Sequence, residues 1–299
     1  PRLSVDARHT TLMPHSRGSI VAPLLIVVSC TATQASAGFA HRAFESIGAL
    51  PVTSVRFTIA ALSLLLFARP RLRGRSAAEW RAMVLFGACC VVMNGAFYQG
   101  VARMPLGNVT SIEFCGPFAI AVLSSRSWKE ARWVALAAVG VLVVAHPIPR
   151  ATGSVSAFAL PAAVGWALYN RMSKRVGALG SGLEGLALSI SIAALMLSPV
   201  TIATIPRMTS TDLLNVSLSA VIGVTFAFSL ELMALRLVAA KKVSVYFSLD
   251  PVAAFAIGVV MLSQPLSWSA ILGCACIVVA SISVARHEDD TTVVTPPLT

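Results

Sequence analysis

The stretch SIEFCGPFAIAV, residues 111–122, places one acidic residue in an otherwise apolar run. Glu113 lies four residues before Pro117, about one helical turn away, and no basic residue stands beside it. What a carboxylate can do next to a helix breaker depends on the solvent around the chain. That solvent is indicated by the composition.

The composition indicates a membrane protein. Of the 299 residues, 57% are hydrophobic and only 12% are charged, and the mean hydropathy is +0.81. Soluble domains carry about 25% charged residues. Apolar stretches near the ~20 residues needed to cross a bilayer recur along the whole chain. Because backbone groups in hydrocarbon must hydrogen-bond within their own segment, we expect an all-α polytopic membrane protein.

The apolar stretches predict ten transmembrane helices. The first contains VVSC (27–30) and ASA (35–37), which resemble cleavage sites, but nine further spans with matching charge alternation favour a retained first helix. The fifth span is the least marked of the ten. The expected spans are residues 20–40, 48–67, 82–102, 106–124, 132–147, 154–171, 184–205, 213–235, 242–262 and 267–285.

The basic residues fall between these spans and predict an orientation. With the N-terminus inside, eighteen of the 23 Lys and Arg residues lie in cytoplasmic segments. The opposite side carries only Arg42, Arg103, Arg150 and Arg207, and Arg56 lies within a span. Both termini are therefore expected to be cytoplasmic. The net charge of +11 is explained by these loops, and no nucleic-acid partner is expected.

Two stretches suggest an internal repeat: ARMPLGNVTSIEFCGPFAIAV (102–122) and LRLVAAKKVSVYFSLDPVAAFAIGV (235–259). Each has a short Arg-containing connection, then an apolar helix with an acid just before a proline. We expect five-helix halves at 20–147 and 148–286, flanked by tails at 1–19 and 287–299. Because five is odd, the second half enters the membrane inverted, and inverted repeats build a site at mid-membrane between them.

Four charged residues stand out within the predicted spans, away from the span ends: Arg56, Glu113, Glu231 and Asp250. Each costs roughly 2.5–3.5 kcal/mol at the membrane centre, so together they cost on the order of 10 kcal/mol. One alternative is that Arg56 pairs with a single carboxylate only to hold helices together. It cannot neutralise all three acids, so at least two are left to be protonated or to meet a cationic ligand.

Glu113 is the leading candidate for proton coupling. Low dielectric favours the protonated form of a carboxyl group, and a nearby cation favours the charged form. Such a group binds a proton or an ammonium, one at a time. Pro117 frees the carbonyl of Glu113 by removing a helical hydrogen bond, and Pro251 could open the ninth helix in the same way. Each proline could also be a harmless kink.

Neutral polar residues add a second group of candidates. Asn94 and Tyr98 are four apart on the third helix, hence on one face. Tyr169 lies late in the sixth helix, and Tyr246 stands one turn before Asp250. An amide or phenol facing the interior can fix a ligand's orientation. The alternative for each is a hydrogen bond between helices.

Several stretches together resemble a known family: PVTSVRFTIAAL (51–62), MNGAFYQGVARMPLG (93–107), EFCGPFAIAVLSS (113–125), GWALYNRMSKR (165–175), and FSLELMALRL (228–237) followed by SLDP (248–251). They are similar to the drug/metabolite transporter superfamily and, more narrowly, to EamA-type exporters of the threonine/homoserine efflux group. The likeness runs over most of residues 20–286.

The resemblance implies two inverted five-helix repeats, a central cavity and alternating access that exports amino acids or similar metabolites across a bacterial inner membrane. Asp250 departs from the group, which tends to carry Glu there. Residues 29–50, with His41 and Arg42, match poorly, which leaves the substrate open. The positions that match the group's pattern are Arg56, Asn94, Tyr98, Glu113, Pro117, Tyr169, Glu231 and Pro251.

These observations predict a secondary exporter of small amino acids or related metabolites, exchanging them for protons. Glu113 would bind the ammonium or the proton, and Arg56 or the N-terminus of a broken helix would bind the carboxylate. Asn94 and Tyr98 would orient the ligand. The same fold could instead export a drug, a nucleoside or an aromatic amino acid. A homodimer in the lipid bilayer is compatible with the sequence.

An intramembrane enzyme is the remote alternative. It would need a nucleophile or a metal cluster, but the chain has no H-E-x-x-H or G-x-S-x-G motif and its five histidines are scattered. Cys274-x-Cys276 lacks partners for a metal site, and all six cysteines lie in predicted spans, as packing residues would. We therefore expect no metal, no cofactor and no enzymatic activity.

Overall fold

The protein is described here from a computed structural model, which describes residues 15–123, 128–145, 155–178, 182–237 and 247–289. These residues form helices joined by short connections, and none of them lies in a strand. The prediction of an all-α membrane protein is confirmed. The α-helices are α1 His15–His41, α2 Phe44–Ile47, α3 Ala49–Ala68, α4 Ala77–Val101, α5 Leu106–Leu123, α6 Trp128–Ala145, α8 Leu160–Ala178, α9 Gly182–Met196, α10 Ser198–Thr204, α11 Ser210–Ser219, α12 Ala227–Leu237, α14 Asp250–Leu262 and α15 Trp268–Asp289.

Within the described residues, four helical segments are long and apolar enough to cross a bilayer: Val21–His41, Ala49–Ala68, Ala77–Val101 and Ser210–Ala234. A fifth is obtained if the bent pair α9 and α10 counts as one span. The total of ten spans and the two inverted repeats therefore stay predictions.

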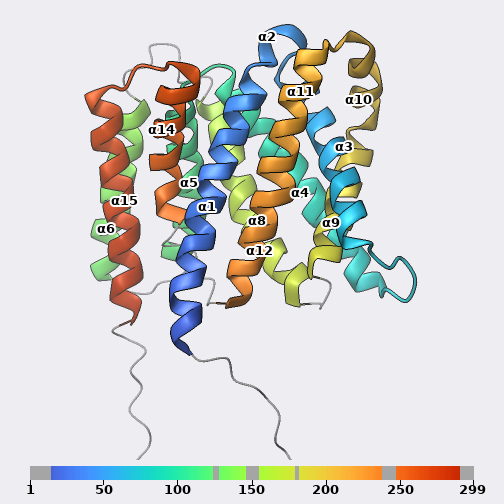
Figure 1. The fold of residues 1–299 in the computed structure, drawn as a ribbon. Coiled ribbons are helices and arrows are strands. Elements are labelled where there is room, and N and C mark those ends of the chain that lie inside the picture. The colour runs from blue at the N-terminus through green and yellow to red at the C-terminus, as the bar shows by residue number, and fades with distance from the viewer. Residues whose placement is uncertain (1–14, 124–127, 146–154, 179–181, 238–246, 290–299) are drawn as a thin grey trace, which may run out of the picture.

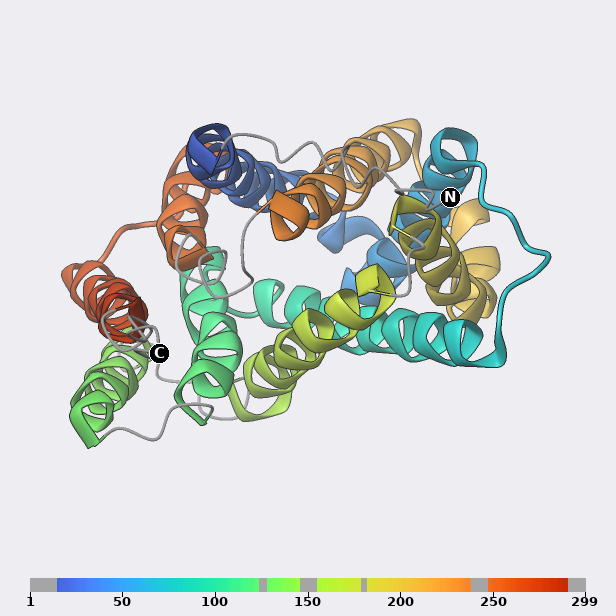
Figure 2. The same ribbon diagram turned by 90° about the horizontal axis from the view of Figure 1, so that it is seen from below.

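The helices form a bundle with a ring at its centre (Figure 1). Figure 2 shows α1, α14, α5, α8 and α12 surrounding a central region, with α4 alongside α8. The pair α6 and α15 lies outside this ring on one side, and α3, α9 and α10 lie on the other. Small residues allow ring helices to approach closely. A side chain at Gly116 of α5, for example, would collide with the backbone of Ala163 in α8.

Three of the predicted spans are not simple α-helices. The span expected at 184–205 bends by 64° between α9 and α10, where Pro199 falls in the first turn of α10 and starts a new helix. The span expected at 213–235 contains a π-helical segment, η3 (Ala220–Phe226), between α11 and α12. The sixth span begins with another, η1 (Val155–Ala159).

Pro251 stands at the start of a described helix. It lies in the first turn of α14, which follows a 3₁₀ turn, η4 (Phe247–Leu249). A proline in the first turn gives up a backbone N–H that has no partner within the helix anyway. Pro251 is therefore compatible with the start of α14, and its predicted role in opening the ninth span stays a prediction. The earlier part of the expected ninth span, residues 242–246, lies outside the described residues.

The buried core consists of two large apolar clusters that meet in the middle of α4. One cluster contains Phe86, Cys90 and Met93, and the other contains Phe97 and Val101. The side chains where the two clusters meet face a shared cavity. The apolar packing thus surrounds a polar centre on both sides along the axis of the bundle.

Candidate binding chamber

One cavity of about 50 Å³ at this junction brings the predicted polar residues together. We call it the chamber. Seven of the polar side chains singled out from the sequence line it, although they come from α3, α4, α5, α8, α12 and α14. The lining residues are Thr33, Gln34, Arg56, Met93, Asn94, Phe97, Tyr98, Glu113, Trp166, Tyr169, Phe228, Glu231, Phe247 and Asp250.

Arg56 is buried among neutral partners. Its Nη1 donates to Asn94 Oδ1 at 3.1 Å, its Nη2 to Ser36 Oγ at 3.0 Å, and its Nε to the Ser219 carbonyl at 3.4 Å. The guanidinium carbon lies 4.7 Å from the centre of the Tyr98 ring, a favourable cation–π arrangement. Within the described residues Arg56 makes no ion pair with an acid. The structure therefore does not support a purely structural Arg56–carboxylate pair.

The shape of helix α11–η3–α12 makes this position possible. Ser219, whose carbonyl accepts from Arg56, directly precedes the π-helical segment. A side chain at Gly223 would collide with Ser36 and lie 2.6 Å from Arg56 Nη2. Only glycine at 223 leaves room for the guanidinium and its serine partner. π-Helical segments occur frequently at functional sites.

Asn94 and Tyr98 serve Arg56 in this structure. The Asn94 amide oxygen accepts from Arg56, and its Nδ2 donates to the Cys90 carbonyl at 3.1 Å. Tyr98 presents its ring to the guanidinium. Both side chains contact Arg56 and also line the chamber, and their role in orienting a ligand stays a prediction.

Glu231 is the best satisfied of the three acids. Its Oε1 accepts from Ser29 Oγ at 3.2 Å and its Oε2 from Tyr169 Oη at 3.1 Å. The serine hydroxyl also lies 3.1 Å from the Ala227 carbonyl. The donors are neutral, so the carboxylate has hydrogen bonds but no opposite charge among the described residues.

Asp250 and Glu113 are less satisfied. Asp250 Oδ2 accepts from Gln34 Nε2 at 3.0 Å, while its Oδ1 is buried without a hydrogen-bond partner in the described part of the chain. Glu113 is 7% exposed and makes no hydrogen bond to any residue that the structure describes. Both carboxylates thus have free acceptor capacity beside the chamber.

Asp250 lies near both other acids of the chamber. Asp250 is close enough to act electrostatically on both Glu113 and Glu231. With all groups ionised, three carboxylates and one guanidinium would leave a net charge of −2 in a buried space. Burying uncompensated charge is costly, so this set of groups favours uptake of protons or of a cationic group.

Two predicted features cannot be placed. Helix α5 runs through Pro117, but the side chain of that residue, like the whole of Tyr246, lies outside the described residues. The predicted role of Pro117 in freeing a carbonyl next to Glu113 therefore stays a prediction.

Sequence reasoning missed part of the chamber. Gln34, which orients Asp250, is an amide in an apolar span and carries the same signal that identified Asn94. Trp166, Phe228 and Phe247 also line the cavity. Nothing in the sequence distinguishes these aromatic residues from those that pack elsewhere in the bundle.

A multi-pass bundle of apolar helices around a charged interior chamber defines the class of protein, a helical membrane transporter of small molecules. Residues 154–286 match the model of the EamA-like transporter family. The threonine/homoserine exporter RhtA of Salmonella typhimurium strain LT2 is 30% identical over 265 residues, covering 87% of this chain and 89% of the relative. RhtA of Escherichia coli K12 is 29% identical with the same coverage. The chain belongs to the EamA-like transporter family.

The fold is also found in a solved structure. One crystal structure of a protein matches with a TM-score of 0.59 and 15% sequence identity, over 92% of this chain and 98% of the other. At this identity the match concerns the fold alone.

Proposed function

We propose that this protein is a secondary exporter of small, threonine- or homoserine-like amino acids or related metabolites, driven by exchange with protons. The observation that carries the proposal is the separation of opposite charges within one chamber. Arg56 has only neutral hydrogen-bond partners, and the three acids have no basic partner among the described residues. A zwitterionic amino acid supplies both missing partners, its carboxylate for Arg56 and its ammonium for an acid.

Glu113 is the proposed site of proton coupling. It faces the chamber, is buried, and has no hydrogen bond to a described residue. A carboxyl group in this setting favours its protonated form until a cation approaches. Arrival of an ammonium then favours release of the proton. Competition of this kind couples the outward movement of cargo to the inward movement of protons.

The size of the chamber favours small cargo. A volume of about 50 Å³ holds a few water molecules, at roughly 10–15 Å³ each, whereas pockets for drug-sized ligands measure about 300–1,000 Å³. The aromatic wall of Phe97, Trp166, Phe228 and Phe247 supports a second candidate, the export of aromatic amino acids or other bulky solutes. Family membership argues against the intramembrane enzyme.

We further propose alternating access between the halves 20–147 and 148–286, in the inner membrane of a bacterium with both termini in the cytoplasm. Both halves of the sequence contribute residues to the chamber. Those of the first half lie on α1, α3, α4 and α5, and those of the second half include residues of α8, α12 and α14. Helix α1 begins and α15 ends at the same end of the bundle (Figure 1), which supports termini on one side.

The test is transport by the purified chain in proteoliposomes loaded with radiolabelled threonine. An imposed pH gradient should drive efflux from wild-type vesicles, and Glu113→Gln should abolish that stimulation. Glu184→Gln is the matched control, because it removes the same charge at the surface of the bundle. Unchanged proton-driven efflux in Glu113→Gln would remove Glu113 from the mechanism.

A competition panel decides the cargo. Unlabelled homoserine should inhibit threonine efflux, and phenylalanine, tryptophan and a nucleoside should not. If the bulky solutes compete and homoserine does not, the second candidate replaces the first.

A further inference from the structure

The connection between α3 and α4 is strongly basic. Its sequence, RPRLRGRS (69–76), places four arginines in seven residues. Arg69, Arg71 and Arg73 are exposed and their side chains make no hydrogen bond or ion pair with the described residues. They are three free guanidinium groups on one short loop.

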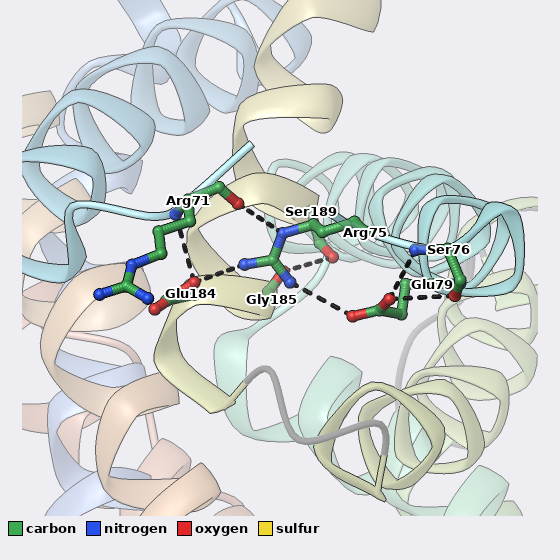
Figure 3. Close-up of polar contacts among 7 residues, drawn as sticks. All are labelled: Arg71, Arg75, Ser76, Glu79, Glu184, Gly185 and Ser189. Atoms are coloured by element: carbon green, nitrogen blue, oxygen red, sulfur yellow. Dashed lines mark hydrogen bonds and ion pairs between the residues drawn. The ribbon is translucent and has the colours of Figure 1, made fainter. Parts of the chain in front are cut away.

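The fourth arginine fixes the base of the loop. The Arg75 guanidinium donates to Glu184 at the start of α9, approaches Glu79 Oε1 at 3.6 Å, and donates through Nε to the Arg71 carbonyl at 2.7 Å. Figure 3 shows that the main chain of Arg71 takes part in this network, with its N–H directed to Glu184. The loop is thus tied to two helices, while the other arginine side chains are left available.

The loop lies where lipid is expected. It projects sideways from the bundle at the end where α1 begins and α15 ends (Figures 1 and 2). Apolar side chains lie next to the arginines: Phe67 at the end of α3 is 76% exposed, and Leu72 in the loop is 60% exposed. Free guanidinium groups above exposed apolar side chains match the polar–apolar boundary of a bilayer.

We propose that the loop of residues 69–76 binds the phosphate headgroups of anionic phospholipids. Guanidinium groups bind phosphate through paired N–H donors, and basic clusters next to a membrane span attract anionic lipid. The apolar neighbours favour a lipid over a soluble phosphate, because Leu72 and Phe67 would contact acyl chains. The proposal concerns a different surface from the chamber and does not depend on the cargo.

The test is native mass spectrometry of the purified full-length chain in a neutral detergent, titrated with phosphatidylglycerol and, separately, with phosphatidylcholine. The triple variant Arg69→Gln/Arg71→Gln/Arg73→Gln should weaken binding of the first phosphatidylglycerol by about tenfold or more, since each arginine contributes measurably near an anionic surface. Phosphatidylcholine binding should not change. The triple variant Arg42→Gln/Arg103→Gln/Arg207→Gln is the charge-matched control at the opposite end and should bind phosphatidylglycerol like the wild type.

Two results would overturn the proposal. Equal losses in both triple variants would mean that net charge alone attracts the lipid. Displacement of phosphatidylglycerol by an equal concentration of glycerol phosphate would identify a site for a soluble phosphate ester. If the loop triple variant does not fold, Arg73→Gln alone tests whether the loop binds phosphatidylglycerol. Its affinity for the first phosphatidylglycerol should fall by about fivefold, and an unchanged affinity would overturn the proposal.

Discussion

The chamber and the rim of the bundle around Arg75 place arginine and acidic residues in different arrangements. At the rim, Arg75 contacts two acids, Glu79 and Glu184, in a partly exposed ion-pair network (Figure 3). In the chamber, Arg56 contacts an amide, a hydroxyl and a carbonyl, although three acids line the same cavity. Arg75 therefore has acidic partners at the rim, whereas Arg56 has none among the described residues of the chamber.

This difference is the opposite of what the stability of the fold alone would favour. Ion pairs at a surface contribute only about 0–1 kcal/mol, whereas buried charges without an opposite partner are costly. A structure selected for stability alone would pair the buried groups first. The rim pairs fasten the α3–α4 loop to α9, and the unpaired chamber groups are available for a solute that carries both charges.

The largest expected effect comes from removing the chamber arginine. Arg56→Gln keeps a hydrogen-bonding side chain but would leave the carboxylate of the proposed amino-acid cargo without a charged partner. Loss of one member of a buried charge pair costs about 2–5 kcal/mol, so threonine efflux from proteoliposomes should fall by about 30-fold or more.

Efflux by an Arg75→Gln variant tests the same loss of charge at the rim and is compared with efflux by Arg56→Gln. It removes the same charge from a partly exposed network, so efflux should stay within about twofold of wild type, given the small contribution of such pairs. Equal losses in the two variants would mean that the contrast between rim and chamber has no functional meaning.

A smaller effect is expected from the glycine that makes room for Arg56. In Gly223→Ala the new methyl group would collide with Ser36 and lie 2.6 Å from Arg56 Nη2. Overpacking of this kind costs typically 1–3 kcal/mol, and the displaced guanidinium should also reduce efflux. Unfolding in a denaturant titration in micelles measures the first effect and proteoliposome transport the second.

Gly95→Ala is the matched control for this variant. Gly95 is also helical, but a side chain there would meet nothing within 4 Å. Alanine is the better helix former, so stability should be unchanged or slightly higher and efflux should be normal. A Gly223→Ala protein that behaves like Gly95→Ala would show that the close fit around Arg56 is not needed.

The same contrast explains what the sequence could and could not reveal. Glu113, Glu231 and Asp250 stand out because an acid in an apolar span is too costly to be incidental, and the structure places all three on one cavity. Two hydrogen-bond partners of Arg56, Ser36 and the Ser219 carbonyl, could not be predicted from the sequence. Ser36 is a small residue of a kind common in membrane helices, and the carbonyl of Ser219 belongs to the backbone, which carries no signal in the sequence.

For the helices, the sequence predicts the fold class better than it predicts where each helix breaks. The all-α fold follows from hydropathy, because lipid leaves the backbone few alternatives. The position of a break depends on local packing: Pro199 and Pro251 each lie in the first turn of a described helix, and hydropathy alone does not place these helix starts. The π-helical segment η3 had no sequence signal, yet it lies directly beside the arginine that the sequence had identified.

The smallest effect is expected from Glu184→Gln. Glu184 accepts from the Arg75 guanidinium and from the Arg71 N–H, and its side chain is 39% exposed. A glutamine keeps one oxygen acceptor and loses only the charge, so the free energy of unfolding should fall by less than about 1 kcal/mol. Efflux at saturating threonine should be unchanged, because the ion pair lies outside the chamber. An efflux loss comparable to that of Arg56→Gln, with stability preserved, would show instead that the rim network must form or break during transport.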